Sequence, residues 1–114
     1  MALENSVGPE LRQTALGVAA VLHNQLGQYA LGQYYAERLL DQEPTPRNRC
    51  AGHQLQVEAL WGLGSWVKDD ATVDAAIADC DAQHEAIASN LLRGDLARHW
   101  AAQGQAKRAI DLLE

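Results

Sequence analysis

Hydrophobic residues recur every three to four positions through most of this chain, which is the spacing of amphipathic helices. The first such stretch starts near Pro9, and its apolar members are Leu11, Ala15, Leu16, Ala19, Ala20, Leu22 and Leu26. Proline fits a first helical turn because its missing N–H would have no partner there, and glycine readily takes the left-handed conformation that ends a helix. The pattern therefore predicts a helix from about Pro9 to Gly27.

Five further helices are predicted by the same periodicity. They cover about residues 28–42, 46–62, 71–88, 89–103 and 105–114. Pro44 ends the second helix, and Thr45 followed by Pro46 has the residue types of an N-cap and a first turn. The third helix ends at Gly62 or Gly64. The segment after it contains Trp66, a candidate contact residue because tryptophan is enriched among binding hot spots.

The glycines indicate a repeat. Three pairs have members ten residues apart: Gly17 and Gly27, Gly52 and Gly62, and Gly94 and Gly104. The second members are separated by 35 and then 42 residues, a period typical of helical repeat arrays. Six helices with short links then form three antiparallel pairs, in units of about residues 9–44, 46–88 and 89–114.

Residues 16–44 resemble a tetratricopeptide repeat, and residues 93–114 resemble most of another. Gly27, Tyr29 and Pro44 stand at the positions of the family's pattern. The last unit follows the same spacing with Leu96, Ala97, Trp100, Gly104, Ala109 and Leu113. The middle unit, about residues 48–88, departs from the pattern. The resemblance implies an all-α fold, a right-handed α–α superhelix of about three helix hairpins, as a single domain over residues 1–114.

The resemblance also implies a role. Family members bind a peptide or helix in a concave groove lined by the first helix of each pair. The positions carried over from that groove are Asn24, Gln25, Arg49, His53, Gln56 and Arg98. The expected function is a protein–protein interaction module without enzymatic activity or cofactor, in a regulatory or scaffold segment of a larger bacterial-type signalling protein.

Composition narrows the class of partner. Nine basic residues against 15 acidic ones give a formal net charge of −6, and no basic block occurs. Nucleic-acid binding depends on Lys and Arg that neutralise phosphates, so nucleic acid is not an expected partner. No stretch approaches the ~20 apolar residues of a membrane span. The two cysteines lack metal or redox spacing, which favours free thiols and a cytoplasmic protein.

Two alternatives to the expected function stay open at this point. A small chaperone of the secretion type would also present a helical binding surface, to an aggregation-prone client. A helical metal-binding protein or enzyme would use Asp81 and His84, which lie three residues apart on one helix face. Such a site needs three or four ligands, and no second cluster supplies them.

The last predicted helix, residues 105–114, has no polar capping helix after it. Repeat arrays usually need such caps. We therefore expect either a fragment of a longer array or a homodimer formed through this C-terminal helix.

Overall fold

The computed structural model describes residues 8–65 and 70–114, and every regular element in these two segments is an α-helix. The helices are α2 (Pro9–Gln25), α3 (Tyr29–Leu40), α4 (Pro46–Gly62), α5 (Asp70–Ala82), α6 (Ala86–Ala102) and α7 (Ala106–Leu113). The predicted all-α class is therefore confirmed. In the described part, no helix combines the length and the apolar character needed to cross a membrane. Trp66 lies outside the described residues.

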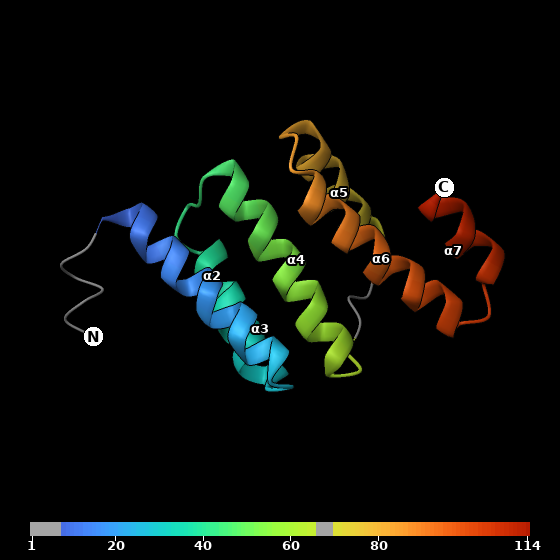
Figure 1. The fold of residues 1–114 in the computed structure, drawn as a ribbon, viewed down its shortest axis with the longest axis horizontal. Helices are drawn as coiled ribbons and strands as arrows, with labels where there is room; N and C mark the ends of the chain where they lie inside the picture. Colours follow the sequence, from blue (N-terminus) through green and yellow to red (C-terminus); the bar gives the residue numbers. More distant parts are fainter. Residues whose placement is uncertain (1–7, 66–69) are drawn as a thin grey trace.

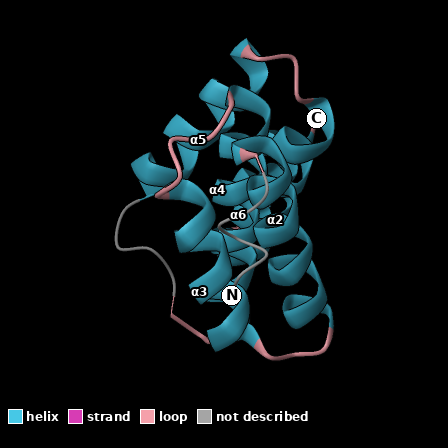
Figure 2. Ribbon diagram, turned by 90° about the vertical axis from the view of Figure 1, so that its left-hand side faces the viewer, coloured by secondary structure: helices cyan, strands magenta, loops and turns pink. Residues whose placement is uncertain are grey.

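Helices α2, α4 and α6 lie side by side along an elongated molecule of 50 × 29 × 20 Å (Figure 1). We call them the leading helices, because each is followed by a helix that runs back along it. Helix α3 packs against α2 and α4, α5 packs against α4 and α6, and α7 packs against α6. After a 90° turn, α3 and α5 lie toward one side and α2 and α6 toward the other (Figure 2). The chain therefore forms a row of hairpins in which α4 and α6 each contact the hairpin before them.

All three leading helices end in the same way. Gly27, Gly64 and Gly104 follow them with φ values of 76°, 70° and 82°, in the left-handed region that glycine adopts at little cost. In each case the N–H after the glycine donates to the carbonyl five residues back, at 2.8–2.9 Å. The equivalent residue of the middle unit is thus Gly64, one of the two helix ends that the sequence left open, and it lies two residues after the Gly62 used in the glycine pairs.

One predicted boundary also moves. The sequence predicted a single helix over residues 71–88, but α5 ends at Ala82 and α6 begins at Ala86. His84 takes the left-handed conformation with φ 58°, and the Glu85 N–H donates to the Cys80 carbonyl at 2.9 Å. Because this helix end uses a histidine where the leading helices use glycine, composition did not mark it.

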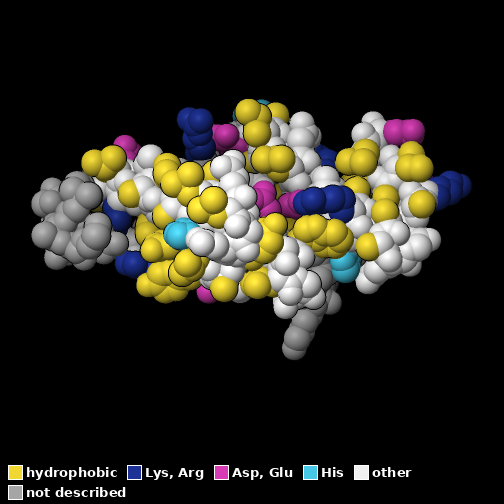
Figure 3. All heavy atoms as spheres, turned by 60° about the horizontal axis from the view of Figure 1, so that its bottom comes forward, with side chains coloured by type: hydrophobic (Ala, Val, Ile, Leu, Met, Phe, Trp, Pro, Cys, Tyr) yellow, Lys and Arg dark blue, Asp and Glu magenta, His cyan; other side chains and the backbone are white. Residues whose placement is uncertain are grey.

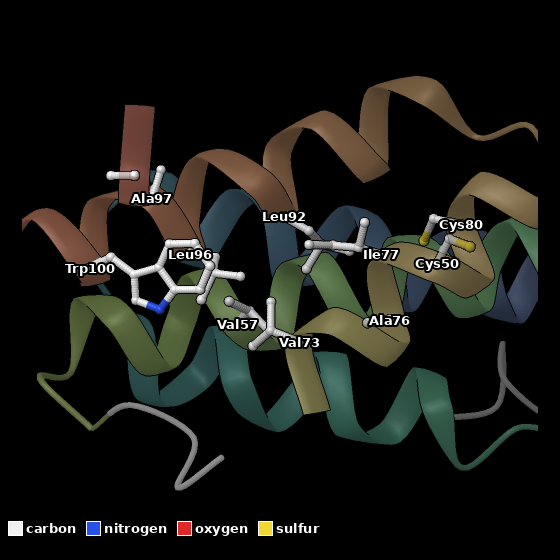
Figure 4. Packing of buried hydrophobic residues seen from close by; sticks show 11 residues of the cluster. Cys50, Val57, Val73, Ala76, Ile77, Cys80, Leu92, Leu96, Ala97 and Trp100 are labelled. Carbon is white, nitrogen blue, oxygen red and sulfur yellow. The ribbon is translucent and has the colours of Figure 1, made fainter. Parts of the chain in front are cut away.

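The larger hydrophobic core joins α4, α5, α6 and α7 (Figure 4). Leu92 and Leu96 of α6 are fully buried in it, together with Val57 of α4 and Val73 of α5. Trp100 of α6 is 5% exposed and packs in the same core. This core holds the second and third hairpins together.

Small residues let the first hairpin approach α4 closely. Ala20 of α2 and Ala36 of α3 form a second buried cluster with Leu55 of α4. At the far end of α4, Gly62 lies under the ring of Tyr29, where an added Cβ would be 2.5 Å from the ring carbons. Gly62 therefore serves helix contact and not helix termination.

Cys50 of α4 and Cys80 of α5 lie next to each other in the larger core, with their sulfur atoms on the same side (Figure 4). Both are free and fully buried. Burial is the main cause that raises the pKa of the Cys80 thiol to about 12. Both thiols, each with a pKa raised by burial, are therefore protonated packing groups at neutral pH.

Candidate partner-binding surface

An open groove of about 640 Å³ runs between α2 and α4, and we call it the α2–α4 groove. Its lining includes Gln13, Thr14, Gly17, Val18, Val21, Leu22, Leu39, Asn48, Ala51 and Leu55. Apolar groups predominate in the lining, amide and hydroxyl groups stand among them, and Glu10 and Arg47 add one charge of each sign. Natural binding pockets have this character, with volumes of roughly 300–1,000 Å³.

The rim of the groove is exposed to solvent. Val18 and Leu22 are each 52% exposed and Val21 is 37% exposed, all on α2. The side chain of Arg47, at the start of α4, is 82% exposed and makes a loose ion pair of 3.9 Å with Glu85. Figure 3 shows hydrophobic side chains spread along one side of the molecule, with acidic and basic groups side by side near the middle. The groove can therefore offer apolar anchoring positions and a cation at one end.

A polar cluster lies beside the groove, where α4 meets α6. The guanidinium of Arg98 stacks over the ring of Trp61, with Cζ 5.4 Å from the ring centroid, and pairs with Asp95 on its own helix. His99 meets the Trp61 ring edge-on, at 6.4 Å between centroids. Glu58 shares this pocket with Trp61 and Arg98. The cluster links the second and third leading helices and leaves Arg98 partly open to solvent.

Asp95 is a buried carboxylate in this cluster that lowers the stability of the folded protein. It is 4% exposed, and its Oδ2 is buried without a hydrogen-bond partner, while Oδ1 accepts from Arg98. Burial raises the pKa of Asp95, and the negative charge of Glu58 adds to this effect, against the opposing influence of Arg98. The ionised form of this carboxylate therefore has a higher free energy in the folded protein than in water.

Replacing Asp95 with asparagine is expected to stabilise the protein at pH 7 by an amount on the order of 1 kcal/mol. Because the native pKa of Asp95 is raised, ionising this carboxyl costs more free energy in the folded state than in the unfolded chain. Stability from this group is present at low pH and lost as the pH rises from about 3.9 through the native pKa. Urea unfolding of both proteins at pH 3 and pH 7 measures the effect, which should vanish at pH 3. The control is Asp74→Asn, at an exposed position of α5, and a destabilised Asp95→Asn protein at pH 7 would contradict the interpretation.

Three of the six predicted groove residues lie at this end of the leading helices. Asn24 and Arg98 line one small pocket together with Trp61. Asn24 is 3% exposed, and its Nδ2 donates to the Leu55 carbonyl at 3.2 Å, so it joins α2 to α4. Gln25 is the exposed last residue of α2. Arg98 and Gln25 are thus accessible to a partner, whereas Asn24 is mainly a contact between helices.

The other three predicted residues are on α4, and two of them face α5. Arg49 donates from Nε and Nη2 to the two carboxylate oxygens of Asp79, both at 2.9 Å. This bidentate pair is the main cause that lowers the pKa of Asp79. His53 lines the same α4–α5 pocket, and burial lowers its pKa. Gln56 is half-buried.

The two-residue register error explains this placement. Two residues rotate a helix by about 200°, so counting back from Gly62 instead of Gly64 turns the assigned face of α4 to the opposite side. The groove residues that this reasoning missed are apolar ones, chiefly Val18, Val21 and Leu22. One sequence signal could have found the register, since Pro9 precedes Gly27 by 18 residues and Pro46 precedes Gly64 by the same 18.

The alternative site at Asp81 and His84 has a different environment. Asp81 accepts hydrogen bonds from Ser89 and Arg93 of α6, and these two bonds lower its pKa. His84 is the exposed left-handed residue after α5. Among the residues described, no group of three or more His, Cys, Asp or Glu side chains is placed to hold a metal ion. Asp81 joins α5 to α6 here.

Comparison with known proteins adds no relative to this description. No protein-family model, curated protein or solved structure matches the chain. The grooves and contacts described above therefore carry the functional argument by themselves.

Proposed function

We propose that the chain is a protein-interaction module, a stack of three tetratricopeptide-like hairpins that winds into a right-handed superhelix. In this proposal a partner peptide or helix lies in the α2–α4 groove and continues toward Arg98. The module then acts as a scaffold or regulatory segment of a signalling protein. The order of helix contacts and the shared glycine ends of the leading helices support the repeat, and the α2–α4 groove supports the binding role.

The observation that carries the proposal is the open apolar lining of this groove beside an exposed cation. Val18, Val21 and Leu22 remain partly accessible, although burying the exposed part of each side chain would gain on the order of 1 kcal/mol. Peptide-binding grooves use apolar anchors for affinity and a few polar contacts for register. Arg47 and Glu10 both line the groove, and Arg98 lies outside it, so the apolar anchors and not a charge of one sign would select the partner segment.

A peptide library tests this proposal directly. Random peptides displayed on phage are selected on the immobilised protein, and the affinities of the enriched peptides are measured by fluorescence anisotropy. Val21→Glu should weaken their binding at least about tenfold, because it places a charge at an apolar anchoring position. Leu31→Glu, at a 45% exposed position of α3 outside the groove, is the matched control.

The peptides should also perturb the NMR signals of the groove residues. Selected peptides that bind Val21→Glu and Leu31→Glu equally well would contradict a partner site between α2 and α4. A selection that yields no binding peptide would contradict the proposed function as a whole.

A further inference from the structure

The two inner junctions of the molecule are built alike, and one further groove of the same kind is open. Helix α4 lies against both α2 and α3, and α6 lies against both α4 and α5. The groove between α6 and α7, which we call the α6–α7 groove, has a volume of about 650 Å³. Its lining includes the apolar or small residues Gly94, Ala97, Ala101, Ala106, Ala109 and Leu113, and the charged Glu58, Asp95 and Arg98 lie along it as well. It stands in the position where a hairpin of this molecule receives the next leading helix.

The opposite end of the molecule carries the complementary face. Residues of α2 and α4 that are 37 positions apart are equivalent, as Gly27 and Gly64 show. Val18 and Leu22 of α2 then correspond to residues 55 and 59 of α4, which are 5% and 0% exposed against the first hairpin. Val18 and Leu22 are each 52% exposed, and Leu11 on the same face is 58% exposed. This face of α2 is therefore a docking face that no described helix covers.

Helix α2 also has the dimensions of the helix that already occupies such a groove. Both α2 and α4 have 17 residues, and both start with a proline. Both end with a leucine cap, Leu26 and Leu63, before a left-handed glycine. A second α2 could therefore enter the α6–α7 groove in the way that α4 enters the groove of the first hairpin.

The sizes of the side chains are compensated between the two faces. In the first junction the groove side is bulky and the entering helix is small, as shown by Tyr29 over Gly62. At the open end the equivalent groove residue, 77 positions later, is Ala106, and the equivalent residue of α2 is Gln25. Likewise Ala101 of the open groove is equivalent to Asn24 of the first hairpin, and Leu22 of α2 is equivalent to Ala59 of α4. The groove has lost bulk where α2 has gained it.

We propose that α2 of a second copy of this chain occupies the α6–α7 groove, so that copies associate head to tail. This contact would continue the row of junctions already present within each chain. The two surfaces differ, and each copy carries one of each, so the association is heterologous and can extend beyond a dimer. The net charge of −6 on each copy opposes this contact, and added salt should therefore strengthen it. The docking face shares Val18 and Leu22 with the α2–α4 groove, so a bound peptide and a second copy would compete for this face of α2.

Sedimentation velocity over a range of concentrations tests the proposal. The mean mass of the unmodified chain should rise with concentration past that of a dimer. Leu22→Glu, which blocks the docking face, and Leu113→Glu, which blocks the groove, should each be monomeric. An equimolar mixture of the two variants should form one-to-one dimers, because the first retains an open groove and the second an intact docking face. Leu11→Glu and Ile110→Glu are a second pair at exposed positions, should either of the first fail to fold.

The outcomes separate head-to-tail contact from its rivals. Leu31→Glu is the matched control and should associate like the unmodified chain, and circular dichroism should show equal helicity for all variants. A chain that stays monomeric at every concentration would overturn the proposal. So would a dimer that Leu113→Glu abolishes and Leu22→Glu leaves intact, since that result indicates two α7 helices paired with each other. Failure of the mixed variants to combine would exclude a heterologous contact.

Discussion

Gly32→Ala is expected to lower the free energy of unfolding by about 1–3 kcal/mol, the cost of overfilling a packed site. A Cβ at this position of α3 would lie 1.8 Å from Oδ1 and 2.7 Å from Cγ of Asn24. Asn24 cannot turn away freely, because it is buried and donates to the Leu55 carbonyl. Losing that bond costs about 1 kcal/mol more, so the total exceeds the ~1 kcal/mol that alanine gains over glycine within a helix. Urea unfolding measures the difference.

Gly17→Ala is the matched control for this substitution. A Cβ on Gly17 would meet only Leu39, at 3.8 Å, which is an ordinary contact. The same change is therefore expected to stabilise the protein by up to about 1 kcal/mol at this position. Asn24→Ala combined with Gly32→Ala should cost less than the sum of the two single changes, because the clash disappears. Equal effects at Gly17 and Gly32 would show that the Asn24 contact does not limit this site.

Leu39→Ala is expected to destabilise the protein by about 2–5 kcal/mol, the range for a buried leucine cut to alanine. Leu39 is 1% exposed and comes from α3 into the space between Gly17 of α2 and Gly52 of α4. It also contributes to the floor of the α2–α4 groove. The substitution therefore opens a cavity at a place where three helices of the first junction meet. Thermal and urea unfolding should both report the loss.

The control for this cavity is Leu31→Ala on the same helix. Leu31 is 45% exposed, and surface changes of this kind usually stay within about 0.5 kcal/mol. A Leu39→Ala protein that unfolds at the same urea concentration as Leu31→Ala would mean that α3 is not held by this contact.

The sequence predicted most helix ends correctly, but it did not predict which face of α4 lines the groove. Pro9, Pro46, Gly27 and Gly104 stand where the structure starts or ends a helix, because their backbone preferences are local. The break at His84 was not foreseeable in this way, because histidine, unlike glycine or proline, has no strong backbone preference that marks a helix end.

The candidate site was predicted only in part, for a related reason. In the sequence, Gly62 suggests a helix end, because glycine is common there. In the structure it is glycine because the Tyr29 ring lies against it, and this contact comes from a distant part of the chain. Because of this error the groove was assigned to the face of α4 that carries Arg49 and His53. That face packs toward α5, where Arg49 binds Asp79. Gln25 and Arg98, placed by the well-marked units, are accessible as expected.

The order of contacts along the row has a mechanical consequence. The first hairpin packs on α4, and its connection to α6 and α7 runs through the middle unit. A force applied along the 50 Å axis therefore acts in series on two joints, the one between the first hairpin and α4 and the one between the middle unit and α6. The two joints rest on separate buried residues, Leu39 and Leu55 at the first and Leu92 and Leu96 at the second, so a pull on the ends should open them in separate steps.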